Sequence, residues 1–393
     1  MGRREFLALC GAGVALPQEN KSEPAVMAGA TEDTTPRVGI VLSSFAEGAE
    51  HDGSRLAGLA HPQPNDAVLS TEFVDAWVRK TIEMGSPRNT NLAKMVARDD
   101  WVVIKTDISS CYGLDKGFLP GSVTDLRVVH GVIAYLVEQQ RGARFTIADG
   151  PGTWQPVEKS GLPVDGWTTD WGGAFGGLSY RKVVDEFAGK HPGIRFELAD
   201  LDFAESLDLP VPGRAAAKQN AAGAYTIPRV IQECDQLISV APLKTDRESG
   251  VALTFHNYLG IAPGAKYGFP KNGLCKLGSQ DEVMVDLFGY RPADYCILGG
   301  AFGVEGDSAG GPGAGTVRHN LLVAGTKAVS VDAVAALLMG FHPEEVPYLP
   351  MAEKSGAFGV VDPDTIWTRG SEIEDARREF RKPANWRARR KEK

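Results

Sequence analysis

Apolar and polar residues alternate in blocks along this chain, and the blocks predict strands and helices in turn. Apolar runs of strand length, each stopped by polar or turn-forming residues, lie at residues 38–45, 101–104, 144–149, 194–198, 237–240, 295–298 and 321–323. Patterns with the helical period lie between many of these runs, at residues 70–84, 123–140, 180–190, 227–233, 280–288 and 329–339. Helices between successive apolar strands imply parallel pairing through right-handed crossovers. We therefore predict an α/β fold with a mostly parallel sheet and helices on both faces.

Capping residues sharpen two of these assignments. Ser70 directly precedes the apolar face of the helix at residues 70–84. Its hydroxyl can accept a hydrogen bond from a backbone N–H of the first turn, which makes it a good N-cap. The helix at residues 123–140 is expected to be capped by Thr124 or Ser122.

Ionisable side chains gather where the predicted strands end. Lys105 and Asp107 follow the second strand, and Asp149 ends the third. The densest group follows the strand that begins at Leu237, within the stretch LISVAPLKTDRESGVALTFHNYLG. Ligands of open α/β sheets bind at the carboxyl ends of the strands, so we expect a site there. The alternative is that the densest stretch is a solvated loop whose charges pair with one another.

The candidate site residues fall into three groups by the chemistry of their side chains. The candidate catalytic residues are Lys105, Asp107, Lys244 and His256. The candidate substrate-binding residues are Arg247, Asn257 and Thr245. The candidate metal ligands, chosen because carboxylates hold Mg²⁺, Mn²⁺ or Ca²⁺, are Asp149, Glu305 and Asp307.

Each group has a structural alternative. Lys105 and Lys244 at two strand ends, with Arg247 close by, would form a positive concavity suited to a carboxylate or phosphate. Lys105 would instead be structural if it paired with one of the acids in an ion network. The carboxylates could act as a general acid and base rather than hold a metal. His256 is an attractive base, although a lone histidine is more often a structural residue.

A glycine-rich loop at residues 299–315 presents Glu305 and Asp307. It lacks the G-x-x-x-x-G-K-[ST] order of a phosphate-binding loop and does not open directly onto a helix. Its glycines are expected to permit tight backbone passage near the site. Asp332, in the predicted helix that follows, is expected in the first turn, where a carboxylate favours the helix dipole.

Composition limits the classes of function. The 393 residues are 43% hydrophobic and 23% charged, an ordinary globular composition that can bury a sizeable core. The formal net charge of -8 argues against nucleic acid as the main partner, because binding phosphates needs a basic surface. No apolar run approaches the roughly 18 residues that a membrane span needs.

Cysteine spacing disfavours an iron–sulfur cluster. Outside the amino-terminal region the cysteines are Cys111, Cys234, Cys275 and Cys296, without a C-x-x-C motif or a histidine at metal spacing. Cys234 and Cys296 lie among apolar residues and are expected to be buried, whereas Cys111 is the candidate for exposure. The cofactor candidate that remains is a divalent metal, and an iron–sulfur cluster is not expected.

The two ends of the chain differ from its body. Arg3 and Arg4 with the short apolar run after them have the shape of a twin-arginine export signal, over residues 1–30. This predicts export by the twin-arginine translocation machinery to the periplasm; the alternative is a retained arm on a cytoplasmic protein. The folded body is expected at residues 36–370. The basic segment 371–393 is expected to be a solvated tail, with contact to an anionic membrane or a partner as the alternative.

The order of motifs resembles the bacterial family called domain of unknown function 362, over about residues 100–360. The matching stretches are VVIKTDIS, TDLRVVHGVIAYLV, ARFTIADGPG, LISVAPLKTDRESGVALTFHNYLGI and ILGGAFGVEGDSAGGPGAGTVRHNLLVAGTKAVSVDAVAALLMGF. The set in this order is specific, whereas any one stretch alone would be weak. The resemblance brings no settled activity with it.

Three places depart from the pattern usual in that family. The family has Lys-Pro-Asn, a His and a Lys-Asn pair at the positions that here are Lys105-Thr106-Asp107, Asp246 and His256-Asn257. A basic group has thus become acidic at Asp246, so ligand chemistry shared by the family is expected to be altered or lost here. Some relatives also carry a ferredoxin-like cysteine-rich extension, whose motif this sequence lacks.

Two functions of different classes follow from these residues. The first is an exported enzyme that uses Lys105, Lys244, Arg247 and nearby carboxylates on an anionic small molecule, with or without a divalent metal. The second is a non-catalytic protein that binds such a molecule. An iron–sulfur redox role ranks third.

Overall fold

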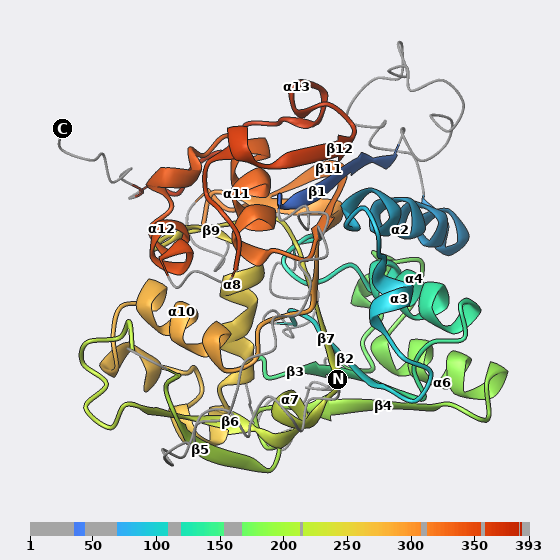
Figure 1. Ribbon diagram of the computed structural model, residues 1–393, viewed down its shortest axis with the longest axis horizontal. Helices are drawn as coiled ribbons and strands as arrows, with labels where there is room; N and C mark the ends of the chain where they lie inside the picture. Colours follow the sequence, from blue (N-terminus) through green and yellow to red (C-terminus); the bar gives the residue numbers. More distant parts are fainter. Residues whose placement is uncertain are drawn as a thin grey trace, which may run out of the picture. The chain divides into compact units, whose positions relative to one another are not determined.

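The described part of the chain is organised on a 10-stranded mixed sheet (Figure 1). The computed structural model describes residues 35–43, 69–108, 119–152, 167–212, 215–307, 313–354, 358–384 and 386. The strands are β1 (Arg37–Leu42), β2 (Trp101–Lys105), β3 (Arg144–Asp149), β4 (Arg195–Asp200), β5 (Ser206–Pro210), β6 (Ala224–Pro228), β7 (Gln236–Ala241), β8 (Lys244–Asp246), β9 (Gly250–Ala252), β10 (Tyr295–Glu305), β11 (Gly315–Gly325) and β12 (Trp367–Gly370). The large sheet has the order β12-β1-β11-β10-β7-β2-β3-β4, with β8 and β9 attached beside β10.

Most neighbouring strands of the large sheet run parallel, so the predicted α/β fold is confirmed. β2 lies between β3 and β7, parallel to both, and β7 is also parallel to β10. β11 pairs antiparallel with both β1 and β10, and β9 pairs antiparallel with β8. The glycine-rich residues 299–315, predicted as a loop, include the end of β10, where the register shifts between Gly300 and Phe302. The sheet is therefore mixed at this side.

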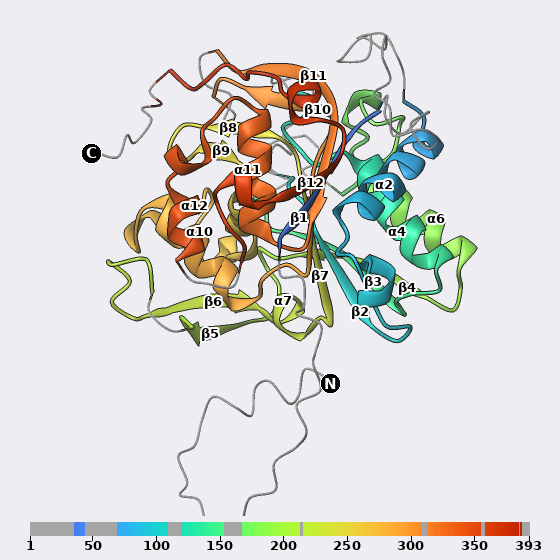
Figure 2. The same cartoon turned by 45° about the horizontal axis from the view of Figure 1, so that its top comes forward.

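Helices cover both faces of the sheet, as predicted (Figure 2). The α-helices are α2 (Thr71–Gly85), α3 (Leu92–Met95), α4 (Leu126–Glu138), α6 (Tyr180–Lys190), α7 (Arg229–Glu233), α8 (Thr254–Asn257), α9 (Gly264–Tyr267), α10 (Gln280–Tyr290), α11 (Ala328–Leu338), α12 (Tyr348–Glu353) and α13 (Ile373–Ala376). Figure 2 places α2, α4 and α6 on one side of the strands, and α10, α11 and α12 on the other. The buried apolar residues form two clusters. Alternate residues of β2 belong to different clusters: Val103 to one, and Val102 and Ile104 to the other.

The capping prediction is confirmed for one helix and wrong for another. Ser70 caps α2, and its hydroxyl accepts a hydrogen bond from the first turn at 3.2 Å. α4 begins later than predicted, with Asp125 as its N-cap in place of Thr124 or Ser122. The Thr124 hydroxyl instead accepts the backbone N–H of Asp107 at 2.8 Å. It therefore fixes the segment that leaves β2.

Several short elements carry too few residues to give a periodic signal. β5 and β6 form a separate antiparallel pair, and β8 and β9 form a tight hairpin at the end of β7. The hairpin spans Lys244–Asp246 and Gly250–Ala252, and α8 follows it directly. The stretch expected to be a loop is therefore largely ordered as strand and helix, which holds its polar side chains in place.

The described residues after position 370 lie on the body, contrary to the solvated tail that their charge pattern predicts. Ala376 and Phe380 are buried, and the carbonyl oxygen of Arg381 accepts a hydrogen bond from Gly306 at 2.8 Å. No helix of the described segments is long and apolar enough to cross a membrane. The proposed signal at residues 1–30 lies outside the described residues.

Candidate functional site

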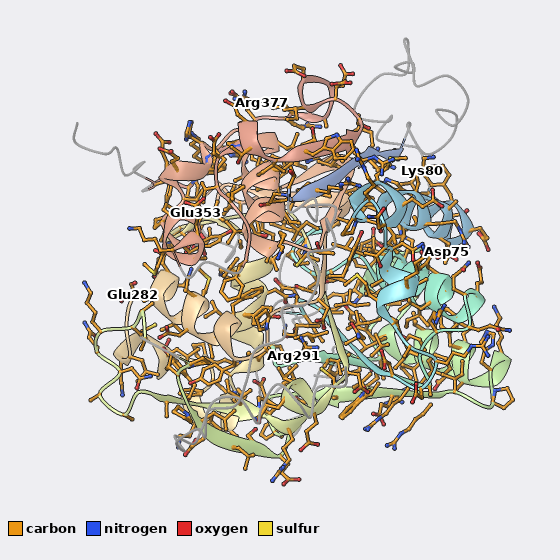
Figure 3. The ribbon with its side chains drawn as sticks, in the orientation of Figure 1. Asp75, Lys80, Glu282, Arg291, Glu353 and Arg377 are labelled. Atoms are coloured by element: carbon orange, nitrogen blue, oxygen red, sulfur yellow. The ribbon has the colours of Figure 1, made fainter. Side chains whose placement is uncertain are left out.

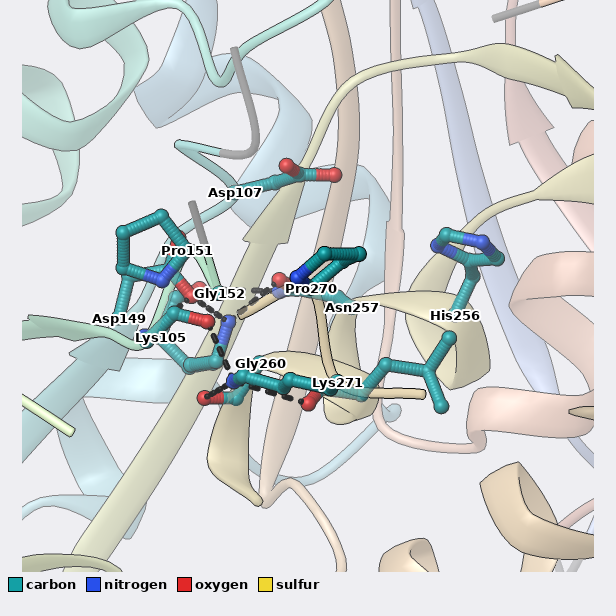
Figure 4. A pocket seen from close by; sticks show the side chains of 12 residues that line it. Lys105, Asp107, Asp149, Pro151, Gly152, His256, Asn257, Gly260, Pro270 and Lys271 are labelled. Atoms are coloured by element: carbon teal, nitrogen blue, oxygen red, sulfur yellow. Dashed lines mark hydrogen bonds and ion pairs between the residues drawn. The ribbon is translucent and has the colours of Figure 1, made fainter. Parts of the chain in front are cut away.

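A cavity of about 230 Å³ opens at the carboxyl ends of β2 and β3, beside α8 (Figure 4). Its lining residues are Lys105, Asp107, Asp149, Gly150, Pro151, Gly152, His256, Asn257, Leu259, Gly260, Pro270 and Lys271. Lys105 ends β2 and is paired in register with Ala148 of β3, so Asp149 is the next residue along the neighbouring strand. Parallel pairing thus brings together two charged residues that are 44 positions apart in the sequence.

Lys105 is the centre of the polar floor of this pocket. Its Nζ donates to Asp149 Oδ1 at 2.5 Å, to Asn257 Oδ1 at 2.8 Å and to the carbonyl oxygen of Thr106 at 2.5 Å. An ammonium group has three donors, and these three acceptors use all of them. Asn257 returns a hydrogen bond from its Nδ2 to the Lys105 carbonyl at 3.2 Å and another to Ser239 Oγ at 3.0 Å. The network therefore fixes Lys105 from strands and helix together.

Asp149 is held as firmly as its lysine. Besides Lys105, the backbone N–H groups of Gly150 and Ile108 donate to its carboxylate at 2.8 and 2.6 Å. Burial raises the pKa of Asp149, against the opposing effect of the Lys105 ammonium. Gly260 covers this ion pair with backbone alone, since a Cβ there would lie 2.4 Å from Asp149 Oδ1 and 2.5 Å from Lys105 Nζ. A larger residue at that position would crowd the charged floor.

A second ion pair in the pocket was missed by sequence reasoning. Lys271 Nζ lies 3.0 Å from Asp202 Oδ1 and donates to the Gly150 carbonyl at 2.6 Å. Asp202 also accepts the backbone N–H groups of Gly152 and Gly264 at 2.7 and 2.9 Å. Burial lowers the pKa of Lys271, and the Asp202 carboxylate opposes this.

The sequence held a signal for one member of this pair only. Asp202 follows the end of β4, so the rule that polar groups gather at carboxyl ends of strands would have found it. Lys271 lies in a loop after the cis peptide bond between Phe269 and Pro270, and no periodic pattern marks it. Only the tertiary structure brings it to Gly150.

Lys244 and Asp107 form a third buried pair next to the pocket. Lys244 Nζ lies 2.6 Å from Asp107 Oδ2 and donates to the Ser122 carbonyl at 3.1 Å. Asp107 lines the pocket, whereas Lys244 is not among the lining residues. The two lysines predicted to form a positive concavity are thus each neutralised by an aspartate, and the structural alternative of an ion network describes both.

His256 lines the pocket from α8, next to Asn257. Its Nε2 lies 3.6 Å from Asp246 Oδ2 of the β8–β9 hairpin. Asp332 accepts the first backbone N–H groups of α8, from Thr254 at 3.1 Å and Phe255 at 3.2 Å. The expectation that Asp332 lies in the first turn of its own helix is wrong: it is the fifth residue of α11 and caps α8 instead. A carboxylate from α11 therefore holds the start of the helix that carries His256.

The remaining candidates lie outside the pocket lining. Thr245 is buried, and its hydroxyl donates to the Gly306 carbonyl at 2.7 Å, which ties β8 to the end of β10. Arg247 pairs with Asp307, with its guanidinium Nε 2.9 Å from Asp307 Oδ2. Glu305 pairs with Arg381 at 3.1 Å. These contacts link the β8–β9 hairpin and Arg381 to the end of β10.

The three candidate metal ligands are therefore not brought together. Asp149 pairs with Lys105, Asp307 with Arg247, and Glu305 with Arg381, so a different cation neutralises each. No group of three or more His, Cys, Asp or Glu side chains suited to a metal occurs in the segments that the structure describes. Of the cysteines in these segments, Cys234 and Cys296 are buried as predicted, and Cys275 is exposed. Cys111 lies outside the described residues.

The pocket falls within the part of the chain that matches a protein family model. The model is described as Domain of unknown function (DUF362), and it matches residues 102–337. This range begins in β2 and ends in α11, so it includes all the lining residues and the capping carboxylate. None of the curated proteins compared with the chain matches it.

Proposed function

We propose, from the premise that this chain belongs to the domain of unknown function 362 family, that it is an enzyme acting on a small anionic molecule bound in the pocket. The proposed chemistry is proton transfer. The observation that carries it is that one cavity borders a buried lysine–aspartate pair and an imidazole, and all three are fixed by hydrogen bonds or caps. Perturbed ionisable groups at a cavity are the usual mark of a reactive site.

In this proposal His256 makes the direct contact with the anion, and Lys271 adds positive charge beside it. Lys105 is only 1% exposed and its donors are all used, so it contributes charge rather than a free hydrogen bond. The side chain of His256 is 21% exposed and borders the cavity. The side chain of Lys271 is 10% exposed and also borders it, but its Nζ already has acceptors in Asp202 and in the carbonyl groups of Gly150, Leu259 and Gly260. The volume of about 230 Å³ is below the usual range for drug-sized ligands, which favours a molecule of few heavy atoms.

Binding without turnover is the second candidate, and the saturation of Lys105 favours it. A lysine whose three donors are filled is well placed to hold neighbouring groups and poorly placed to exchange a proton. The two candidates differ in one result. An enzyme loses turnover in Asp149→Asn while it still binds its ligand, whereas a binding protein has no turnover to lose.

Ligand binding is tested by thermal unfolding with a panel of small anions. The probes are inorganic phosphate, malonate, citrate and glycerol phosphate, chosen for charge and for a size near that of the cavity. A ligand that binds the native state alone stabilises it, by about 2.7 kcal/mol at one hundred times its dissociation constant. We expect stabilisation by at least one probe, lost in His256→Gln and in Lys271→Met.

The control is Asp286→Asn. Asp286 is also buried and accepts backbone N–H groups, from Ala216 and Ala217 at 2.6 and 3.1 Å, but it does not line the pocket. Stabilisation that survives both pocket variants, or disappears in the control as well, would place the anion elsewhere. If no probe stabilises the protein, the anionic ligand is wrong.

We also propose that residues 1–30 are a twin-arginine signal that directs export. The supporting feature is the Arg3-Arg4 pair before a short apolar run. In a bacterial host with a twin-arginine pathway, the protein should appear in the periplasmic fraction. The Arg3→Lys/Arg4→Lys variant should stay in the cytoplasm. Equal distribution of both forms would support the alternative of a retained arm.

A further inference from the structure

The imidazole of His256 faces a carboxylate that is itself fixed. Asp246 Oδ1 accepts the backbone N–H groups of Glu248 at 3.0 Å and Ser249 at 2.8 Å, and Gln280 Nε2 at 2.9 Å. Three donors on Oδ1 hold the carboxyl group in one orientation. Its other oxygen, Oδ2, is the one that lies 3.6 Å from His256 Nε2.

The carboxylate is also kept ionised. Burial acts to raise the pKa of Asp246, but the imidazole of His256 and the N–H groups of Ser249 and Glu248 outweigh it and hold the pKa below its usual range. A negative charge therefore stands beside Nε2 throughout the neutral pH range.

The helix that carries His256 is anchored from the opposite side. Asp332 is fully buried and accepts two N–H groups at the start of α8, and the hydroxyl of Tyr348 donates to it at 2.9 Å. The next residue, Asn257, binds Lys105. Figure 4 shows His256 apart from the cluster around Lys105 and Asp149, with no interaction drawn to the other lining residues.

We propose that Asp246 is a positioning residue that orients His256 as the general base of the pocket. The carboxylate favours a proton on Nε2, which leaves the lone pair of Nδ1 for the ligand. Nδ1 then takes a proton from a hydroxyl, an amine or a carbon next to a carbonyl group. The electron pair of the broken bond stays on the ligand, and Asp246 stabilises the imidazolium that forms. This inference rests on the proposed enzymatic function.

The separation of 3.6 Å is an ion-pair contact rather than a hydrogen bond. Catalytic hydrogen bonds are often long without ligand and shorten when the ligand binds.

The tautomer of His256 tests this proposal without any substrate. We would record ¹H–¹⁵N spectra of protein labelled at histidine, at alkaline pH where imidazoles are neutral, and assign His256 from its absence in His256→Gln. The wild type should show His256 with its proton on Nε2. In Asp246→Asn, the amide oxygen can keep the backbone contacts and the Nδ2 group then donates to Nε2, so the proton should move to Nδ1.

The matched control is Asp307→Asn, which removes the carboxylate that pairs with Arg247 rather than the one that faces His256. It should leave the tautomer unchanged, and Asp246→Ala provides a second variant without an amide. A wild-type proton on Nδ1, or an unchanged tautomer in both Asp246 variants, would overturn the positioning role. The enzymatic proposal fails separately, if the anion panel gives no binding while the tautomer behaves as expected.

Discussion

Two of the clusters of charged side chains in the described part of the chain differ in their surroundings. In the pocket, Lys105 joins Asp149 and Asn257. The other cluster lies among the helices and is centred on His130 of α4. Its Nδ1 lies 2.8 Å from the carboxylate of Asp75 of α2, and its Nε2 lies 3.4 Å from the carboxylate of Glu186 of α6. Figure 3 shows Asp75 on α2. Each cluster links three elements that are distant in the sequence.

The difference lies in what each cluster leaves for a ligand. His130 uses both ring nitrogens on carboxylates, packs against the ring of Phe187 at 4.8 Å between centroids, and does not line the pocket. The pocket cluster borders a cavity and neighbours His256, one of whose nitrogens faces Asp246. Buried charge by itself therefore marks structural cross-links as well as sites. A cavity beside the charge is what separates the two.

The largest expected effect is the loss of the buried cation in the pocket. Lys105→Met leaves Asp149 buried without its partner, which should lower the free energy of unfolding by about 3–5 kcal/mol. Urea denaturation measures this. The double variant Lys105→Met/Asp149→Asn should recover part of the loss, because it removes the unpaired charge. A single variant as stable as the wild type would mean that this pair is not buried in solution.

The second effect concerns Asp332, the cap beneath His256. Burial raises its pKa to about 6. A raised pKa of an acid means that the folded state binds the proton more tightly, so the stabilising contribution is complete below the unfolded pKa and is lost as pH rises through about 6. The loss amounts to about 3 kcal/mol at 1.36 kcal/mol for each pKa unit. Asp332→Asn should remove this pH dependence from the urea unfolding curves. If the free energy of unfolding of Asp332→Asn changed with pH as much as that of the wild type between acid and neutral pH, the assignment to Asp332 would be wrong.

His130 should give a smaller effect, at higher pH. Burial acts to lower the pKa of His130, but the hydrogen bond to Asp75 and the charge of Glu186 outweigh it and raise the pKa. The contribution of this cluster is therefore complete below the unfolded pKa of about 6.5 and is lost as pH rises through the raised value. His130→Gln should cost about 1 kcal/mol at acid pH and little at alkaline pH. Glu72 and Lys190 also lie near this cluster. Lys190→Met should therefore be measured beside His130→Gln, to separate the charge of Lys190 from the effect of His130.

The smallest effect is expected at the exposed edge of the predicted site. Arg247 pairs with Asp307, but its side chain is 55% exposed, and water screens such pairs. Arg247→Ala should leave both the urea midpoint and anion binding unchanged within error. A marked loss of anion binding would return Arg247 to the site and widen the pocket assigned here.

The sequence predicted the α/β class and many of its elements because each has a local signal. Apolar runs gave the strands near β2, β3 and β7, and the helical period gave α2 and α6. Antiparallel β11 was not predicted, because pairing direction depends on how the chain turns at residues 299–315 rather than on periodicity within a strand. Short elements such as α8 carried no period at all.

The candidate site was found in part for the same reason. Lys105, Asp149, His256 and Asn257 lie at the ends of predicted strands or just beyond one, and the rule that ligands bind at these ends located them. Lys271 has no such signal. Thr245, Glu305 and Asp307 were chosen by the same rule, yet they lie outside the pocket lining and contact neighbouring loops and side chains, because the rule finds an edge of the sheet and not a cavity.

By itself, the sequence determined which residue types reach the carboxyl edge of the sheet, because strand periodicity and strand ends are local properties. Only the tertiary structure decided which of them meet. Lys105 and Asn257 are 152 positions apart, and Asp332 caps α8 from 78 positions away. Such contacts depend on strand order, register and helix packing. The sequence therefore predicted which charged residues lie near the site. The tertiary structure showed that most of them neutralise one another around a small cavity.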